Sequence, residues 1–316
     1  MHLLMFLLTL KNYPGDPSSL FVLVRNPSFT GRFTGNVSEA TFIRCADDEA
    51  SDRYESGLID VYVVHREQLI LEALQRYPQD LIAAPGQCVR MLLTNPNSQA
   101  LKRREARQAL AHAIDQTEIV RLSGVASVLP GTGGLVPPGV QGHQPGLGLP
   151  FDVARAKELA HQGHLAKGTF LEFWSQSLRE SVGQAVASSL ERHLGLATHV
   201  QQCGDDVLAK APSEWPFDLA LIVLWRVLPD PLVYLAYPDC MLEASLRRMA
   251  RDAREESDPP KRLELTRRLD AAMIESAVWI PMFYPRGITA ARPWVENASS
   301  FPLFHCGVVD MIVHPH

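Results

Sequence analysis

The side chains that could form a metal site are grouped at one place in this sequence. Glu158, His161 and His164 stand at i, i+3 and i+6, a spacing that can align metal ligands on one helix. Gly163 interrupts this pattern, because glycine commonly ends helices. A helix that ends there would take His164 off the shared face, so the sequence predicts no metal site.

His112 and Asp115 have the residue types of an acid–base pair. Asp115 is better explained as a helix N-cap, because Glu118 follows at the spacing of a capping box. The sequence has no G-x-S-x-G or H-E-x-x-H motif, and the Gly- and Pro-rich segment 130–150 lacks the Lys-Ser/Thr of a phosphate-binding loop. We therefore expect no catalytic residue and no cofactor, and we predict that the protein is not an enzyme.

Composition excludes several classes of protein. The chain has 316 residues, of which 46% are hydrophobic and 21% are charged, with a net charge of -5. This balance is that of a soluble globular chain rather than a disordered one. No run reaches the roughly 20 apolar residues of a membrane helix, and the acidic balance gives no reason to expect nucleic-acid binding. The five cysteines are interpreted as small buried hydrophobes, with disulfides plus a spare thiol as the alternative.

The N-terminus is apolar but does not have the pattern of a signal peptide. It lacks a basic region before its apolar run, and no small-residue cleavage site follows. Instead Pro14 and Gly15 predict a turn, and 19–24 is a second apolar run, so a hairpin is expected. No export signal is visible.

Periodicity along the rest of the chain predicts mixed α/β order. Helices are expected over 47–56, 66–77, 99–113, from 115, and over 152–162, 181–194, 242–256 and 260–277. Asp152 is the expected N-cap of the helix 152–162, with Gly163 at its C′ position. Strands are expected over 36–44, 58–64, 89–94, 169–174, 197–201, 217–225, 279–284 and 307–314. The segment 217–225 is too apolar for a strand with a face in water, so it is the predicted central strand.

Taken in order, these segments resemble the bacterial solute-binding proteins of family 5, the oligopeptide- and dipeptide-binding proteins of ABC importers. The segment 106–115, ARQALAHAID, is similar to the family motif "vRqAlayAiDr". The segments 56–61 and 151–159 are similar to "sGeiDv" and "yDpekAkaLL", and 217–231 to "fDl…W…DP". Each motif alone is weak, but together they cover nearly the whole chain in the family's order.

The resemblance implies an α/β fold of the periplasmic-binding-protein-like class II, with a mixed sheet flanked by helices. It assigns residues 60–285 to the second lobe, and 1–59 with 286–316 to a partial first lobe and the hinge strands. Family members normally carry well over a hundred residues before the first hairpin. We therefore expect this chain to lack most of the first lobe.

The resemblance also implies binding without chemistry. A peptide or similar small solute would be held in an interlobe cleft and delivered to an ABC permease, in the periplasm or at the cell surface. Trp225, Arg226, Val227 and Asp230 are the expected ligand-binding residues, since α/β sheets place ligands where central strands end. The alternative is a cytosolic ligand-sensing or degenerate module, regulatory rather than transporting, which fits the lack of a visible export signal.

Val227 leads to an expectation about how this chain, in contrast to its relatives, holds the N-terminus of a peptide. Peptide-binding members place an acidic residue at this point, shortly before the "DP" pair, to meet the α-ammonium of the peptide. A desolvated ammonium without a counter-charge costs several kcal/mol, so a free peptide N-terminus should be held poorly. Asp230 could replace that acid, although capping the next segment is its commoner role.

Overall fold

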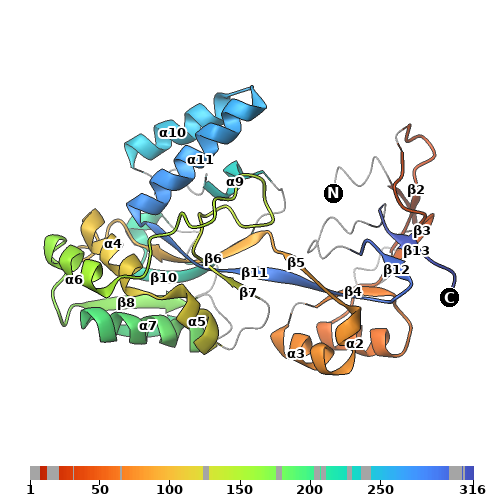
Figure 1. The fold of residues 1–316 in the computed structure, drawn as a ribbon, viewed down its shortest axis with the longest axis horizontal. Coiled ribbons are helices and arrows are strands. Elements are labelled where there is room, and N and C mark those ends of the chain that lie inside the picture. Colours follow the sequence, from red (N-terminus) through yellow and green to blue (C-terminus); the bar gives the residue numbers. More distant parts are fainter. Residues whose placement is uncertain are drawn as a thin grey trace. The chain divides into compact units, whose positions relative to one another are not determined.

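The computed structural model forms two compact units (Figure 1). The residues that it describes are 8–12, 21–30, 32–64, 66–123, 128–175, 180–202, 207, 211–225, 230–235, 243–298, 308 and 310–316. The first unit comprises Met1–Gly86 and Arg286–His316, and the second comprises Gln87–Pro285. Residues 60–86 therefore belong to the first compact unit, whereas the sequence analysis assigned them to the second lobe.

A mixed sheet forms the centre of the second unit. Its strands, in spatial order, are the first half of β11 (Trp279–Ala291), β6 (Cys88–Thr94), β10 (Leu219–Trp225), β8 (Phe170–Ser175) and β9 (Ala197–Gln202). β6 runs antiparallel to both β11 and β10, while β10, β8 and β9 are mutually parallel. A short strand, β7 (Val128–Pro130), pairs with β11 on its other side. The predicted central strand is confirmed, because β10 lies inside the sheet and its residues Leu219–Ile222 are at most 3% exposed.

Helices cover both faces of this sheet, because its inner strands are apolar on both sides. Alternate residues of β6 face opposite ways, as the two-residue period of a strand requires. Leu92 belongs to one hydrophobic cluster, and its neighbours Met91 and Leu93 belong to the other. The first cluster is covered by α4 (Arg104–Ala113), α5 (Gln116–Ser123), α6 (Val153–Gln162) and α7 (Glu180–Leu194). The second is covered by α9 (Leu232–Leu235), α10 (Ala244–Glu255) and α11 (Pro259–Ser276).

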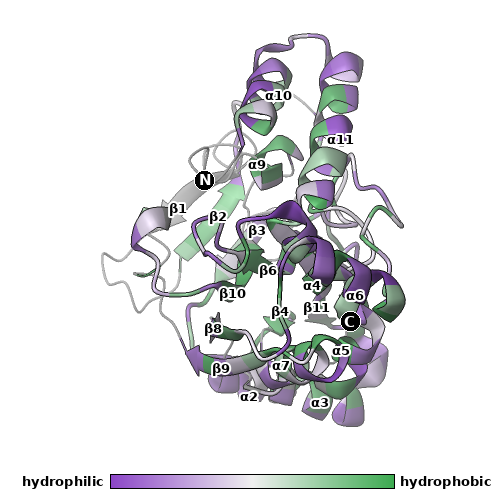
Figure 2. Cartoon of the chain, turned by 90° about the vertical axis from the view of Figure 1, so that its left-hand side faces the viewer, coloured by the Kyte–Doolittle hydropathy of each residue, from purple (hydrophilic) through white to green (hydrophobic). Residues whose placement is uncertain are grey.

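Figure 2 shows the matching hydropathy pattern, with a hydrophobic β6 and with hydrophilic and hydrophobic residues interspersed along α10 and α11. A 3₁₀-helix, Pro212–Glu214, precedes β10. Among the described helices, none combines the length and the apolar character that crossing a membrane would require.

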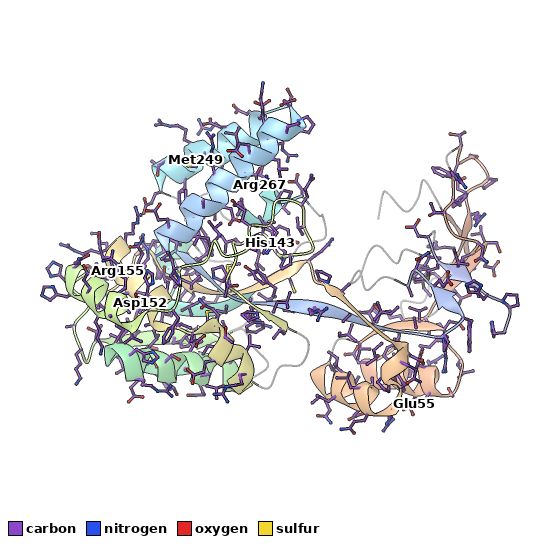
Figure 3. All side chains as sticks on the ribbon, viewed as in Figure 1. Glu55, His143, Asp152, Arg155, Met249 and Arg267 are labelled. Atoms are coloured by element: carbon purple, nitrogen blue, oxygen red, sulfur yellow. The ribbon has the colours of Figure 1, made fainter. Side chains whose placement is uncertain are left out.

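Two predicted helix caps are confirmed. The Asp152 carboxylate accepts a hydrogen bond from the Arg155 backbone N–H at the start of α6, and Figure 3 labels both residues there. The Asp115 carboxylate accepts from the Thr117 N–H at 2.9 Å. The end of α6 differs from expectation, because Gly163 is right-handed and His164 takes the left-handed conformation with φ 59°. Glycine is required at 163 for another reason: a Cβ there would lie 2.4 Å from the Ala106 backbone nitrogen.

The described part of the first unit contains three groups of paired strands, two α-helices and one 3₁₀-helix. The strands of one sheet are β1 (Leu8–Asn12), β2 (Phe21–Arg25) and β3 (Glu39–Phe42), all antiparallel. β4 (Val61–Val64) and β5 (Leu81–Pro85) each pair with the second half of β11, and β12 (Val295–Glu296) pairs with β13 (Ile312–Val313). The helices are α2 (Asp47–Glu55), α3 (Glu67–Arg76) and the 3₁₀-helix Pro78–Asp80.

Two strand boundaries in the first unit differ from the prediction. The expected C-terminal strand 307–314 is reduced to Ile312–Val313, and β11 continues seven residues past the predicted end at Tyr284 to Ala291. β1 and β2 pair as the predicted hairpin, while its Pro-Gly turn lies outside the described residues.

A buried polar cluster lies in the core of the first unit. The Tyr54 hydroxyl donates a 2.6 Å hydrogen bond to Asp80, and the Tyr62 and Tyr77 hydroxyls are 2.7 Å apart. The Arg292 guanidinium covers the Tyr54 ring at 4.1 Å from its centroid. Burial raises the pKa of both Tyr54 and Tyr62, so these phenols stay protonated.

Candidate functional site

The strands of the second unit end together at one edge of its sheet. Parallel strands β8, β9 and β10 finish there, at Ser175, Gln202 and Trp225. The antiparallel strand β6 begins at the same edge, with Cys88 opposite Trp225 in register. Open α/β sheets bind ligands outside the carboxyl ends of their strands. This edge of the second unit is therefore the candidate ligand site.

The four residues predicted from the sequence have different outcomes. Trp225 is the last residue of β10 and stands at this edge. Arg226 and Val227 lie outside the described residues, so their roles, and the poor hold on a peptide ammonium, stay predictions. Asp230 already has partners within the second unit: its carboxylate accepts from the Leu232 N–H at 2.9 Å and from the Arg262 guanidinium at 2.6 Å. The structure thus gives Asp230 the capping role, at the start of α9.

Arg90 is a residue of this edge that the sequence analysis did not single out. It stands on β6 between Val223 of β10 and Phe283 of β11, and its guanidinium lies 6.0 Å from the centroid of the Phe283 ring. Its Nε and Nη1 atoms are shielded from solvent and have no hydrogen-bond partner among the described residues. Burial lowers the pKa of Arg90. The signal in the sequence is one charge inside an otherwise apolar strand, VRMLL.

Cys88 is the other ionisable group beside Arg90, and it is a free thiol. Burial raises its pKa to about 11, which keeps the thiol protonated near neutral pH and removes its nucleophilic form. The adjacent backbone is fixed from α9, because the Tyr234 hydroxyl donates a 2.7 Å hydrogen bond to the carbonyl of Gln87. Cys45 is also a free thiol, and the other three cysteines lie outside the described residues.

The residues that the sequence analysis considered for metal binding and catalysis have structural roles or lie apart from one another. α6 ends at Gln162, so His164 follows the helix rather than extending its face. No group of three or more potential metal ligands occurs within the part of the chain that is described. His112 Nδ1 lies 2.7 Å from the carbonyl oxygen of Pro150, while Asp115 caps α5, so each member of that pair contacts backbone.

The predicted loop over 130–150 is held by a buried carboxylate. Asp270, on α11, is 0% exposed and accepts the Leu135 backbone N–H at 2.8 Å. Its Oδ2 lies where a side chain at position 134 would begin, because a Cβ added to Gly134 would be 2.0 Å from that oxygen. The Tyr284 hydroxyl donates to the Gly134 carbonyl at 2.6 Å, and His143, labelled in Figure 3, packs edge-on against the Tyr284 ring. Burial raises the pKa of Asp270 to about 6.

Solved structures of binding proteins share this architecture. The periplasmic murein tripeptide-binding protein MppA, in its unliganded open form, matches with a TM-score of 0.78 at 15% identity, over 98% of this chain and 64% of that one. DppA from Helicobacter pylori, in complex with the peptide STSA, matches with a TM-score of 0.69 at 15% identity, over 97% and 62%. CtaP from Listeria monocytogenes, an ABC transporter substrate-binding protein, matches at 0.78 and 16% identity, over 97% and 66%. These likenesses define the fold as α/β of the periplasmic-binding-protein-like class, as expected.

The family follows from the sequence match. The model of the bacterial extracellular solute-binding proteins, family 5 (middle), matches residues 11–239, which is more than half of the chain. The protein therefore belongs to this family, and the resemblance of its motifs is confirmed. No curated protein sequence matches the chain. The chain spans about 64% of the length of the MppA structure that it matches.

Proposed function

We propose that this protein binds a peptide or a similar small solute without transforming it and delivers the solute to an ABC permease. The match of the family 5 model to residues 11–239 carries this proposal. A peptide complex of the similar fold in DppA supports the solute class. The proposal includes the closure of two lobes around the solute that the family resemblance implies, which would exclude water and strengthen each polar contact.

The solute is proposed to bind at the carboxyl edge of the sheet in the second unit. Trp225, Arg226 and Val227 are the proposed contacts from the end of β10. Asp230 is proposed to act by holding the start of α9 in place through its bonds to Leu232 and Arg262. The nearby Cys88 thiol is held in its protonated form, so it is not proposed as a nucleophile.

Native mass spectrometry of the purified protein tests the solute class. We expect a co-purified peptide or peptide-like molecule, released unchanged on denaturation. Binding is then measured by calorimetry with short peptides, and the peptides are recovered afterwards to check that they are intact. Recovery of cleaved or modified peptides would contradict a pure binding role, and failure of every peptide to bind would contradict the solute class.

The substitution at Val227 has its own test. We expect N-acetylation of a bound peptide to change its affinity less than threefold, because no acidic side chain stands at the position that meets the α-ammonium in peptide-binding relatives. The paired measurement uses free and N-acetylated forms of one tripeptide, with the variant Val227→Asp as the matched comparison. A large loss on acetylation in the unmodified protein would show that another group meets the ammonium.

The cellular location of the protein and the identity of its partner distinguish a transport function from a sensing function. We expect the protein to fractionate with the periplasm or the cell surface of its source bacterium and to crosslink to a membrane permease. A cytosolic location together with a soluble partner would favour the ligand-sensing alternative.

A further inference from the structure

Two side-chain nitrogens of Arg90 are left unmatched at the candidate site. Its Nε and Nη1 atoms have no hydrogen-bond partner in the described part of the chain, and no described carboxylate pairs with it. Cys88 supplies the one neighbouring ionisable group among the described residues, and that thiol is protonated near neutral pH. The guanidinium therefore carries its charge into a shielded position that has no counter-charge among the described residues.

Such an arrangement is costly, and a second buried arginine of this chain, Arg107, avoids it. A guanidinium stays protonated in proteins, so it cannot escape burial by losing its charge. Arg107 on α4 is 3% exposed, yet each of its three nitrogens is engaged. Its Nε donates to the Ser276 carbonyl at 3.0 Å, its Nη1 to the Lys102 carbonyl at 3.0 Å, and its Nη2 to Glu243 at 3.4 Å. The contrast indicates that any partner of Arg90 comes from outside the described residues.

Arg90 is also well placed to meet a ligand. It stands two residues into β6 from the sheet edge, opposite Val223, which is two residues before the end of β10. The guanidinium lies over the Phe283 ring, 6.0 Å from its centroid, at the outer limit of a cation–π contact. Buried cations bind carboxylates through charge-assisted hydrogen bonds, which are about twice as strong as neutral ones.

We propose that Arg90 binds a carboxylate of the solute and makes this site select anionic solutes over neutral ones. This inference rests on the proposed function, because it assigns a specificity to the proposed binding site. A peptide offers two sources of the carboxylate, its C-terminus and an acidic side chain. Anchoring by the anionic end also agrees with the absence of an acid at Val227 for the ammonium end.

Calorimetry with three synthetic peptides tests this specificity. Ala-Ala-Ala carries a C-terminal carboxylate, its C-terminal amide carries none, and Ala-Asp-Ala amide carries one on a side chain. We expect the neutral amide to bind at least tenfold more weakly than Ala-Ala-Ala. Recovery of affinity by Ala-Asp-Ala amide would identify a side-chain carboxylate as sufficient, and no recovery would identify the C-terminus as the bound group. Either result supports a carboxylate at Arg90.

The variant Arg90→Met assigns the effect to this residue. We expect it to weaken Ala-Ala-Ala at least tenfold and to leave the amide within twofold, so the preference disappears. Arg155→Met, which removes an exposed arginine of α6, is the matched control and should keep the preference. If the unmodified protein binds acid and amide equally, or if Arg90→Met keeps the preference, the inference is overturned while the proposed function stands. If no peptide binds at all, both are overturned.

A stability measurement separates this role from a purely structural one. Because Arg90→Met removes buried donors that lack partners, we expect the melting temperature of the ligand-free protein to rise by roughly 2 °C or more. Arg155→Met should leave it unchanged within about 1 °C. A fall in melting temperature for Arg90→Met would show that Arg90 supports the fold, and would overturn its assignment as a ligand-binding residue.

Discussion

Asp270 provides a prediction whose magnitude follows from the structure. The carboxyl group is 0% exposed, and burial raises its pKa from 3.8 to about 6. The folded protein therefore binds a proton more tightly than the unfolded chain does. Between about pH 4 and pH 6 the folded state holds more protons at this site, so the free energy of unfolding falls as the pH rises. The loss is complete above about pH 7.

The size of this effect is about 3 kcal/mol, because the shift is about two pKa units and each unit corresponds to about 1.4 kcal/mol. Asp270→Asn keeps the shape of the side chain and an oxygen that can accept the Leu135 N–H, but it cannot ionise. The stability of the variant minus that of the unmodified protein should therefore increase by about 2.4 kcal/mol from pH 4 to pH 7, since the rest of the change falls below pH 4.

Urea unfolding followed by tryptophan fluorescence measures this difference. Four of the five tryptophans belong to the second unit, which contains Asp270, so the signal reports mainly on that unit. Titrations at pH 4, 5, 6 and 7 give the difference in stability, in which the contributions of all other groups cancel. Asp252→Asn, an exposed carboxylate on α10, is the control and should show no such trend. A constant difference between Asp270→Asn and the unmodified protein would refute the argument.

Three further substitutions have expected effects on stability, each measured by urea unfolding. Gly134→Ala should destabilise by about 2–4 kcal/mol, because the new methyl group would occupy the position of the Asp270 carboxylate; a change below 1 kcal/mol would show that α11 yields easily. Tyr54→Phe should cost about 1–3 kcal/mol, since it leaves the buried Asp80 without its hydroxyl donor. Asp152→Ala should cost about 1 kcal/mol by removing the cap of α6, whereas Asp152→Asn should be nearly neutral.

Several elements could be predicted from the sequence because their causes are local. Helix caps depend on a side chain and the backbone two or three residues away, so Asp115 and Asp152 were identified from spacing alone. The apolar run of β10 indicated a strand covered on both faces, and the two helix layers around it confirm this. The order of the motifs likewise indicated solute-binding family 5, and the match of the family model to residues 11–239 confirms it.

Other features depend on residues far apart in the chain and could not be predicted in this way. Gly163 was expected to be glycine as a helix end, but it is glycine because α4 passes within contact of its backbone. Asp270 resembles any helical aspartate until the fold packs it against Gly134, more than a hundred residues earlier. The division at Gly86 and Gln87 follows the contacts of β5 and β6 with different halves of β11, and no composition change marks it.

The sequence by itself determined the class of the protein, because periodicity, capping and motif order act over short stretches that a reader of the chain can recognise. Only the tertiary structure decided which polar groups are satisfied. Arg90 stands in the apolar segment VRMLL and Arg107 in the charged segment KRREARQ, and neither setting shows which of the two side chains finds partners. The fold surrounds Arg107 with carbonyl oxygens and a carboxylate but gives two nitrogens of Arg90 no partner within the described residues. The burial and bonding of a charge depend on which distant segments pack beside it.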